Sequence, residues 1–257
     1  MHPILFQVGD FAIRGYGLMA AIGFMAGIWI ASKEAERLGV NKELIVDMAF
    51  YMVLAAIIGS RILHVAIEWR HFFEHPADII KIWQGGLVFY GGLIGAIMVG
   101  SFYIWKHSLP FWRTADIFAV GIPLGHAFGR IGCFLAGCCY GLATDLPWGV
   151  EFTDPHSLAP LHTHIHPTQL YSAANNLVIF FILFLLRKKK KFEGQLALTY
   201  VFLYSITRGL IEMLRGDERG AVLAGQISTA QVIGLLLALT AVGAMVYLYG
   251  KESAKKG

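Results

Sequence analysis

Charged residues are scarce in this 257-residue chain. Asp, Glu, Lys and Arg make up 15% of it, whereas soluble domains contain about 25%. Hydrophobic residues reach 56% and the mean hydropathy is +0.60. A soluble protein of this size needs a polar shell that such a composition cannot supply, and intrinsic disorder or a collagen-like fold needs a different composition. The composition therefore predicts an integral membrane protein.

Cysteine is also scarce, with three residues that all lie between positions 133 and 139. This number excludes a disulfide-rich scaffold, and because it is odd, at least one cysteine stays outside any intramolecular pairing. The net charge of +4 would suggest a nucleic-acid partner for a soluble protein. In a membrane protein the distribution of Lys and Arg sets the orientation instead, so we expect no nucleic acid to bind.

Apolar runs long enough to cross a bilayer, about 17–25 residues, recur along the chain. The first residues have no basic region and no cleavage site, so we expect no cleaved signal peptide. No long soluble linker separates the runs, and the sequence contains no detectable internal repeat. The sequence therefore predicts an all-α fold with a single seven-span domain over residues 1–257. The predicted spans cover residues 11–32, 44–68, 86–105, 115–135, 168–186, 195–214 and 228–249.

The basic residues between these spans are distributed unevenly. With the N-terminus outside, thirteen Lys and Arg residues fall on the inner side, including the run at 187–191, and four fall on the outer side. Because Lys and Arg concentrate on the cytoplasmic side of membrane proteins, we expect an external N-terminus and a cytoplasmic C-terminus. The connection at 137–167 is then an external loop, and it contains no Lys or Arg.

Ionisable side chains inside a membrane cost roughly 2.5–3.5 kcal/mol each on insertion scales, so they usually mark function. Several of them share one depth here, the outer end of the spans, and Arg208 and Glu212 lie on one helical face. Clustered arginines attract an anion with paired acceptors, such as a phospholipid headgroup. The alternative is that Arg14, Arg61 and Arg215, which follows the sixth predicted span, only reach the interface or form ion pairs. The group comprises Arg14, Tyr16, Arg61, His64, Tyr90, Arg130, Arg208 and Glu212.

Other polar or small residues in the spans have a structural interpretation. Asp47 and Asp116 lie near the starts of two predicted helices, where the helix dipole favours a carboxylate, and we expect both to be caps. The glycines at 91, 92 and 95 and at 125, 129 and 132 permit close helix packing. They equally permit a backbone to approach a ligand, and the sequence leaves both open.

Six short motifs lie in order along the chain. They are Tyr-Gly-Leu-Met at 16–19, Gly-Ser-Arg at 59–61, Phe-Tyr-Gly-Gly-Leu-Ile-Gly at 89–95, Gly-Arg-Ile-Gly-Cys-Phe at 129–134, His-Pro-Thr-Gln-Leu-Tyr at 166–171 and the spaced Tyr204, Arg208 and Glu212. These motifs resemble those of the bacterial prolipoprotein diacylglyceryl transferases, and the segment at 129–134 resembles the Gly-Arg-x-Gly-Asn-Phe signature of that family. Each motif alone is weak, but their order on seven spans makes the resemblance strong.

The resemblance implies a reaction and a set of roles. A diacylglyceryl group moves from phosphatidylglycerol to the lipobox cysteine thiol in the signal-peptide segment of a preprolipoprotein, and glycerol phosphate leaves. Arg130 binds the lipid headgroup, Arg208 stabilises the phosphate, Glu212 orients Arg208 and Tyr204 donates a hydrogen bond. The reaction needs no cofactor and takes place at the periplasmic leaflet of the bacterial inner membrane, among membrane lipids. Further residues of the same cavity are Gly129, Gly132, Cys133, Arg61 and Tyr16.

Four departures from the family pattern concern the base and the acceptor. Tyr90 replaces the histidine to which the role of base is given, and a phenol with a reference pKa near 10 is a poor base for a thiol near 8.5. The sequence leaves several alternatives open. Neighbouring arginines lower the pKa of Tyr90 so that it acts as the base, or His64 or His166 takes the thiol proton, or the thiolate forms without a side-chain base. A paralogue with the same lipid site and another acceptor is an alternative. The other departures are Cys133 for Asn, Cys138 for an acidic residue and Ser172 for Glu.

The cysteines and the nearby histidines at 162, 164 and 166 raise the question of a metal site. Zinc accepts both thiolate and imidazole, but the spacing matches no closed zinc motif, so we expect no metal. A disulfide from Cys133 to Cys138 or Cys139 is favoured, because the loop faces an oxidising compartment and neighbouring cysteines pair only with strain. Three buried thiols without chemistry are the other possibility.

Two other classes of membrane protein fit the sequence less well. A small-solute transporter or channel needs polar residues along the whole pathway, whereas the charges here lie at one depth. A thiol redox protein needs a Cys-x-x-Cys pair, which the sequence does not contain. The sequence therefore favours an enzyme with a site in the outer leaflet.

Overall fold

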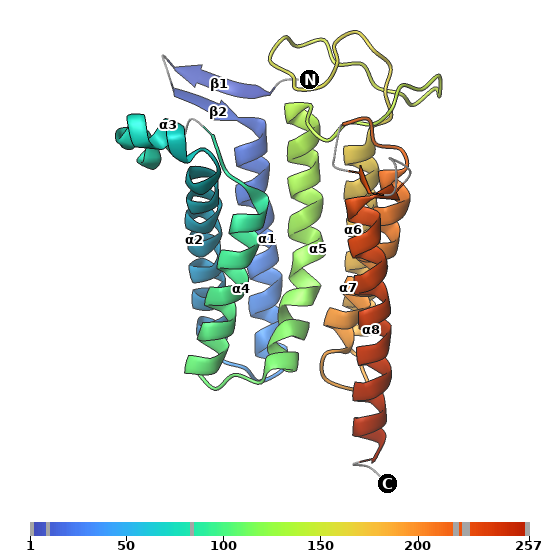
Figure 1. Cartoon of the computed structure of the whole chain (residues 1–257). Coiled ribbons are helices and arrows are strands. Elements are labelled where there is room, and N and C mark those ends of the chain that lie inside the picture. Colours follow the sequence, from blue (N-terminus) through green and yellow to red (C-terminus); the bar gives the residue numbers. More distant parts are fainter. Residues whose placement is uncertain (1–2, 9–10, 83–84, 218–220, 223–226, 255–257) are drawn as a thin grey trace. The chain divides into compact units, whose positions relative to one another are not determined.

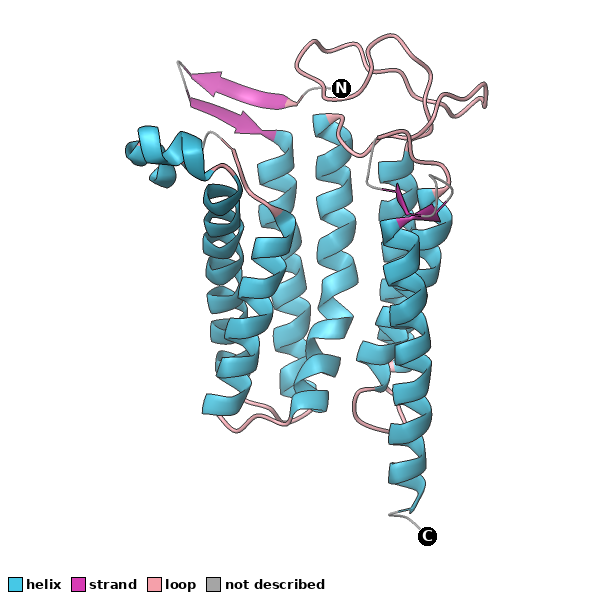
Figure 2. Cartoon of the chain, viewed as in Figure 1, coloured by secondary structure: helices cyan, strands magenta, loops and turns pink. Residues whose placement is uncertain are grey.

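The computed structural model describes residues 3–8, 11–82, 85–217, 221–222 and 227–254. Helices dominate the described residues, and four short strands form two small antiparallel sheets (Figures 1 and 2). The chain divides into two compact units. The first unit contains residues 1–31 and 115–257, and the second contains residues 32–114.

The first unit begins with a hairpin of β1 (Ile4–Val8) and β2 (Phe11–Arg14) that leads directly into α1 (Gly15–Arg37). The first predicted span, which was expected to begin at residue 11, is therefore wrong at its start, since 11–14 pair with β1 instead of coiling. The unit continues with α5 (Phe111–Ala136), α6 (Thr168–Leu186), α7 (Gln195–Glu212), β3 (Ala221–Val222), β4 (Ile227–Ser228) and α8 (Thr229–Ala254).

Close packing of α1 against α5 holds the centre of the first unit. A Cβ on Gly23 would lie 2.6 Å from the carbonyl oxygen of Gly125, and a Cβ on Gly121 would lie 2.3 Å from that of Gly27. Only glycine permits backbones to approach so closely. Beside this contact, apolar side chains of α1, α5, α6 and α7 form a core that includes Ile30, Ala119, Val120, Ile179, Phe180, Leu183 and Leu196.

The second unit is a pair of packed helices with a short helical connection. It contains α2 (Lys42–Ile67), α3 (Trp69–Glu74), the 3₁₀ helix η1 (Pro76–Ile80) and α4 (Phe89–Lys106). A Cβ on Gly91 would lie 2.3 Å from the carbonyl oxygen of Gly59, and one on Gly95 would lie 2.5 Å from that of Ala55. The glycines of the Phe-Tyr-Gly-Gly segment therefore serve helix packing.

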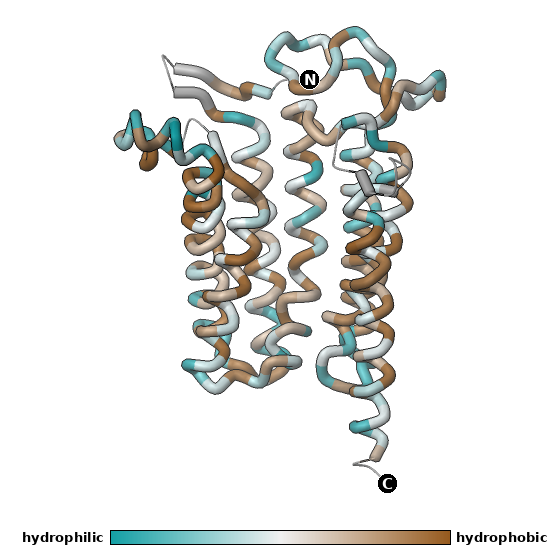
Figure 3. Tube along the Cα trace, in the orientation of Figure 1, coloured by the Kyte–Doolittle hydropathy of each residue, from teal (hydrophilic) through white to brown (hydrophobic). Residues whose placement is uncertain are grey.

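Five helices of the described chain, α1, α2, α5, α6 and α8, are long and apolar enough to cross a membrane. The other two predicted spans fall on α4 and α7, each of 18 residues. Large apolar side chains point outward on the helices, among them Met98, Trp105 and Leu235, at 66%, 76% and 63% exposure. Hydrophobic residues run along the helices and hydrophilic ones gather near their ends and in the loops (Figure 3). This pattern is that of a membrane protein whose outer helix surfaces face lipid.

The connection at 137–167 is ordered although it contains no helix. Isolated bridges join Val150 to Ile165 and Phe152 to Leu161. Phe152, Ala159 and Ile165 form a small core, each at most 5% exposed. A further bridge between Gly141 and Arg215 ties this loop to the segment after α7.

Asp116 caps a helix, but not the one in which it lies. The buried carboxylate of this α5 residue accepts hydrogen bonds from the backbone N–H groups of Gly194 and Ala197, at 2.9 and 3.0 Å, which belong to the first turn of α7. It also pairs with Lys190 Nζ at 3.0 Å. The expectation of a cap is confirmed for α7, whereas the sequence pointed to the start of α5. Asp47 is exposed on α2.

Candidate active site

The C-terminal end of α7 carries a network of arginines and carboxylates. Arg208 donates a hydrogen bond to Glu212 one turn later, and Arg215 lies 3.8 Å from the same carboxylate. Arg215 also makes a two-pronged contact with Asp217, with both N···O distances at 2.7 Å. The Arg215 side chain is only 4% exposed and that of Glu212 only 6%. Because the acids hold Arg208 and Arg215, the guanidinium groups have fixed orientations.

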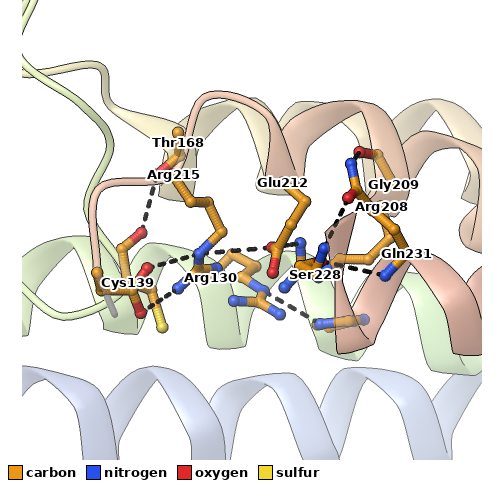
Figure 4. Close-up of polar contacts among 11 residues, drawn as sticks. Arg130, Cys139, Thr168, Arg208, Gly209, Glu212, Arg215, Ser228 and Gln231 are labelled. Carbon is orange, nitrogen blue, oxygen red and sulfur yellow. Dashed lines mark hydrogen bonds and ion pairs between the residues drawn. The ribbon is translucent and has the colours of Figure 1, made fainter. Parts of the chain in front are cut away.

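Arg130 of α5 lies beside this network (Figure 4). Its Nε donates to Nε2 of His126 at 3.2 Å, one turn earlier on the same helix. The His126 ring lies 5.1 Å from that of Tyr204, which in turn stacks on Tyr200. Within the described residues Arg130 makes no ion pair with a carboxylate, unlike Arg208 and Arg215. It is therefore the guanidinium whose charge an external anion can neutralise.

The glycines around Arg130 have different roles. A Cβ on Gly132 would lie 3.1 Å from Met19 Cβ and 3.2 Å from the carbonyl oxygen of Tyr16, so Gly132 lets α1 approach α5. A Cβ on Gly129 would meet nothing within 4 Å. Gly129 thus borders open space and is not required for close helix packing. The Tyr16 side chain, at 49% exposure, stands on the neighbouring helix.

The three cysteines converge at the end of α5. Cys133 lies one turn after Arg130, and Cys138 and Cys139 follow Gly137, whose φ of +75° turns the chain out of the helix. Their three sulfur atoms lie within 4.8 Å of one another. All three are thiols, so the predicted disulfide is not formed in this structure. The cysteines instead form a compact cluster beside the arginines.

His166 lies at the base of the external loop. Its backbone bonds to Gly141 and Leu142, and its Nδ1 lies 3.3 Å from the hydroxyl oxygen of Tyr171. The indole N–H of Trp148 donates to the same hydroxyl at 2.8 Å. The structure thus gathers most of the predicted site residues in the first unit: Tyr16, Gly129, Arg130, Gly132, Cys133, His166, Tyr204, Arg208 and Glu212.

Arg61 lies in the second unit and contacts main-chain oxygens. Its guanidinium donates to the carbonyl oxygens of Asp78, Ile79, Gly85 and Gly86, and its charge lies 5.2 Å from the centre of the Phe72 ring. These bonds tie α2 to η1 and to the segment before α4. Arg61, predicted to line the lipid cavity, has most of its donors occupied by the chain.

Replacement of Arg61 with alanine is expected to destabilise the second unit. It leaves several carbonyl groups of a partly buried segment without their donor, at a cost of about 2–3 kcal/mol. Thermal unfolding of the protein in detergent measures this loss. The matched control is Arg70→Ala, because Arg70 is exposed and its guanidinium lies over the ring of the neighbouring Trp69. Equal unfolding midpoints for the two variants would contradict the structural role.

His64 and Tyr90 also belong to the second unit. A Cβ on Gly86, where φ is +74°, would lie 2.4 Å from His64 Nε2, so only glycine fits there. His64 and Arg61 line a cavity of about 250 Å³ together with Glu68 and His71. Tyr90 is 60% exposed at the start of α4. Both remain predicted bases.

Two residues of the arginine network were not among the predicted site residues. Arg215 was counted with the outer loops, although it is more deeply buried than Arg208, whose side chain is 13% exposed. Its position in the sequence between two acidic residues, Glu212 and Asp217, could have indicated that Arg215 is held in ion pairs. His126 was overlooked inside an apolar run, although its spacing of four residues from Arg130 places both on one helical face.

Comparison with known proteins gives one consistent result. The family model described as prolipoprotein diacylglyceryl transferase matches residues 3–247. A protein of Clostridium tetani is 37% identical over 91% of this chain and 93% of its own length. One of Bacillus velezensis is 36% identical over 100% and 95%, and one of Clostridioides difficile is 36% identical over 98% and 97%. All three are named phosphatidylglycerol--prolipoprotein diacylglyceryl transferase. The chain with this arginine network is a member of the prolipoprotein diacylglyceryl transferase family.

Proposed function

We propose that this membrane enzyme transfers the diacylglyceryl group of phosphatidylglycerol to the lipobox cysteine of a preprolipoprotein. The relatives that carry the corresponding name match over nearly their whole length. In the reaction the thiolate sulfur attacks the glycerol carbon next to the phosphate ester, a thioether forms and the C–O bond breaks. Glycerol phosphate leaves with the bonding electrons. The negative charge on the phosphate therefore grows along the reaction.

The observation that carries the proposal is the state of Arg130. Its guanidinium is held by His126 and makes no carboxylate pair in the described chain. The phosphodiester of phosphatidylglycerol carries one negative charge and two acceptor oxygens, which suit a guanidinium fork. A donor fixed in a site of low dielectric stabilises the leaving phosphate without reorganisation. Arg130 thus binds the headgroup, and His126 positions Arg130.

The other residues have supporting roles in this proposal. Arg208 stabilises the departing phosphate, and its hydrogen bond with Glu212 orients it. Tyr204 donates a hydrogen bond, and Tyr16 lines the lipid cavity. The base that takes the thiol proton is Tyr90, His64 or His166, unless the thiolate forms without a side-chain base.

The proposed topology has seven spans, α1, α2 and α4 to α8, with the N-terminus outside and the C-terminus in the cytoplasm. Two observations support it. The helices coincide with the seven apolar runs within a few residues at nearly every end, and the basic residues concentrate on one side. The arginine network then lies toward the periplasmic leaflet of the bacterial inner membrane, where lipid and an incoming signal-peptide segment both have access.

The direct test is an assay of the purified chain with phosphatidylglycerol and a peptide that contains a lipobox cysteine. Mass spectrometry should detect the peptide with one added diacylglyceryl group. Two controls isolate the substrates: a peptide with serine in place of the cysteine, and phosphatidylethanolamine as the lipid. Binding of phosphatidylglycerol without any product would favour a second candidate, a paralogue with another acceptor, which the departures at Tyr90, Cys133 and Cys138 would then explain.

A further inference from the structure

The three thiols at the end of α5 form a site that the transfer reaction does not require. Cys133 projects from the last turns of the helix, and Cys138 and Cys139 return toward it after the turn at Gly137. The sulfur atoms lie within 4.8 Å of one another. Three thiolates around a zinc ion at about 2.3 Å are separated by roughly 3.8 Å. The cluster therefore needs only a small contraction to bind a metal ion.

The backbone around the cluster is held by buried side chains of α6. Thr168 Oγ1 donates to the carbonyl oxygen of Cys139 and Gln169 Nε2 to that of Cys138, both at 2.8 Å. Thr168 and Gln169 are each 1% exposed. Cys139 has a φ of +63°, a left-handed conformation that residues other than glycine rarely adopt. These contacts fix the direction of the sulfurs before any ligand arrives.

Charges near the cluster favour thiolates. The Arg215 guanidinium hydrogen-bonds the Cys139 side chain, and Arg130 lies within electrostatic range of Cys133 and Cys139. Three thiolates around Zn²⁺ carry a net charge of −1, and around Cu⁺ a net charge of −2. Both complexes are anionic, and the two guanidinium groups complement them.

We propose that Cys133, Cys138 and Cys139 form a binding site for a thiophilic metal ion, Cu⁺ or Zn²⁺. Soft thiolate ligands select these ions over magnesium, calcium or manganese. Three sulfurs complete a trigonal site for Cu⁺ and leave zinc one position for a small external ligand. Binding releases the protons of those cysteines that are still thiols. The spacing in the sequence matched no zinc motif. The sulfurs are brought together instead by the turn at Gly137 and by the contacts with α6, which the spacing does not report.

The test measures metal binding by the purified full chain in detergent under a non-chelating reductant. Zn²⁺ is titrated against a chromophoric chelator, and Cu⁺ against bathocuproine disulfonate. One equivalent of at least one ion per chain is expected. Cys133→Ser and Cys138→Ser should each weaken binding at least about 100-fold, because each removes one ligand from three. Cys139→Gly should do the same, and glycine tolerates the positive φ, so this variant keeps its fold.

The control variant is His162→Ala, which removes an exposed imidazole of the same loop and should leave the affinity unchanged. These three cysteines are the only ones in the chain, so a triple variant is free of thiols. Three outcomes would overturn the proposal: no stoichiometric binding of either ion, binding that survives in the triple variant, or a disulfide within the cluster in protein prepared without an oxidant. The measurements contain neither phospholipid nor peptide, so they are independent of the transferase activity.

Discussion

Replacement of Arg130 with alanine is expected to reduce diacylglyceryl transfer at least about 100-fold, the loss typical for removal of a preorganised charge-stabilising donor. The reason is that no carboxylate of the described chain neutralises the guanidinium of Arg130, so in the proposed function the phosphodiester of the lipid is its partner. The rate of formation of diacylglyceryl peptide, measured by mass spectrometry at saturating phosphatidylglycerol, gives the effect. Arg130→Lys should retain part of the activity, because it keeps the charge but loses the paired donors.

The matched control is Arg70→Ala, which removes an exposed arginine from α3 and should leave the rate unchanged. The unfolding midpoint of each variant shows whether the loss concerns the reaction or the fold. Activity of Arg130→Ala within twofold of the unaltered protein would assign headgroup binding to another residue. Arg208 would then be the next candidate, because it lies in the same network and its pairing with Glu212 still leaves donors available.

Asp116→Ala is expected to cause the largest loss of stability, about 3–5 kcal/mol, the cost of removing one partner of a buried ion pair. The carboxylate is completely buried, whereas the Lys190 side chain is 16% exposed. Its removal leaves the ammonium group and the N–H groups of Gly194 and Ala197 without their acceptor. These N–H groups lie at the N-terminal end of α7, the helix that carries Arg208 and Glu212. Loss of their acceptor therefore destabilises this helix, and activity should fall in proportion to the fraction of folded protein. Thermal or denaturant unfolding in detergent measures the effect.

Asp47→Asn provides the comparison, since Asp47 is exposed on α2 and surface substitutions usually change stability by less than about 0.5 kcal/mol. Asp116→Asn should have an intermediate effect, because an amide oxygen still accepts hydrogen bonds but no longer neutralises Lys190. If Asp116→Ala unfolded at the same temperature as Asp47→Asn, the cap of α7 would contribute nothing to stability.

The helices could be predicted because the bilayer imposes a simple rule on the sequence. A spanning segment must satisfy all backbone hydrogen bonds internally and present apolar side chains to lipid. The sixth helix starts and ends at the predicted residues, Thr168 and Leu186. The predicted start of the first helix was wrong, because residues 11–13 are as apolar as the residues of a span. These residues form a strand and not a helix because they pair with β1.

The arginine network was predicted in part for a similar reason. Arg130 and Arg208 stood out because a charge deep inside an apolar run is costly. Arg215 did not stand out, because it follows the apolar run and looks like a loop residue. The bridge between Gly141 and Arg215 and the two-pronged contact with Asp217 bury it. A burial of this kind depends on a loop more than 70 positions away in the chain, which no local pattern reports.

The sequence by itself determined the membrane character, the order of the helices, the family resemblance and the presence of Arg130 and Arg208 inside apolar runs. All of these depend on composition or on local residue spacing, and both can be read from the sequence without knowledge of the fold. Only the tertiary structure decided that Asp116 caps α7, that Arg61 bonds the backbone of the second unit, and that three cysteines converge into one cluster. These depend on which distant segments meet, and close packing at glycines such as Gly23 and Gly121 determines which helices approach.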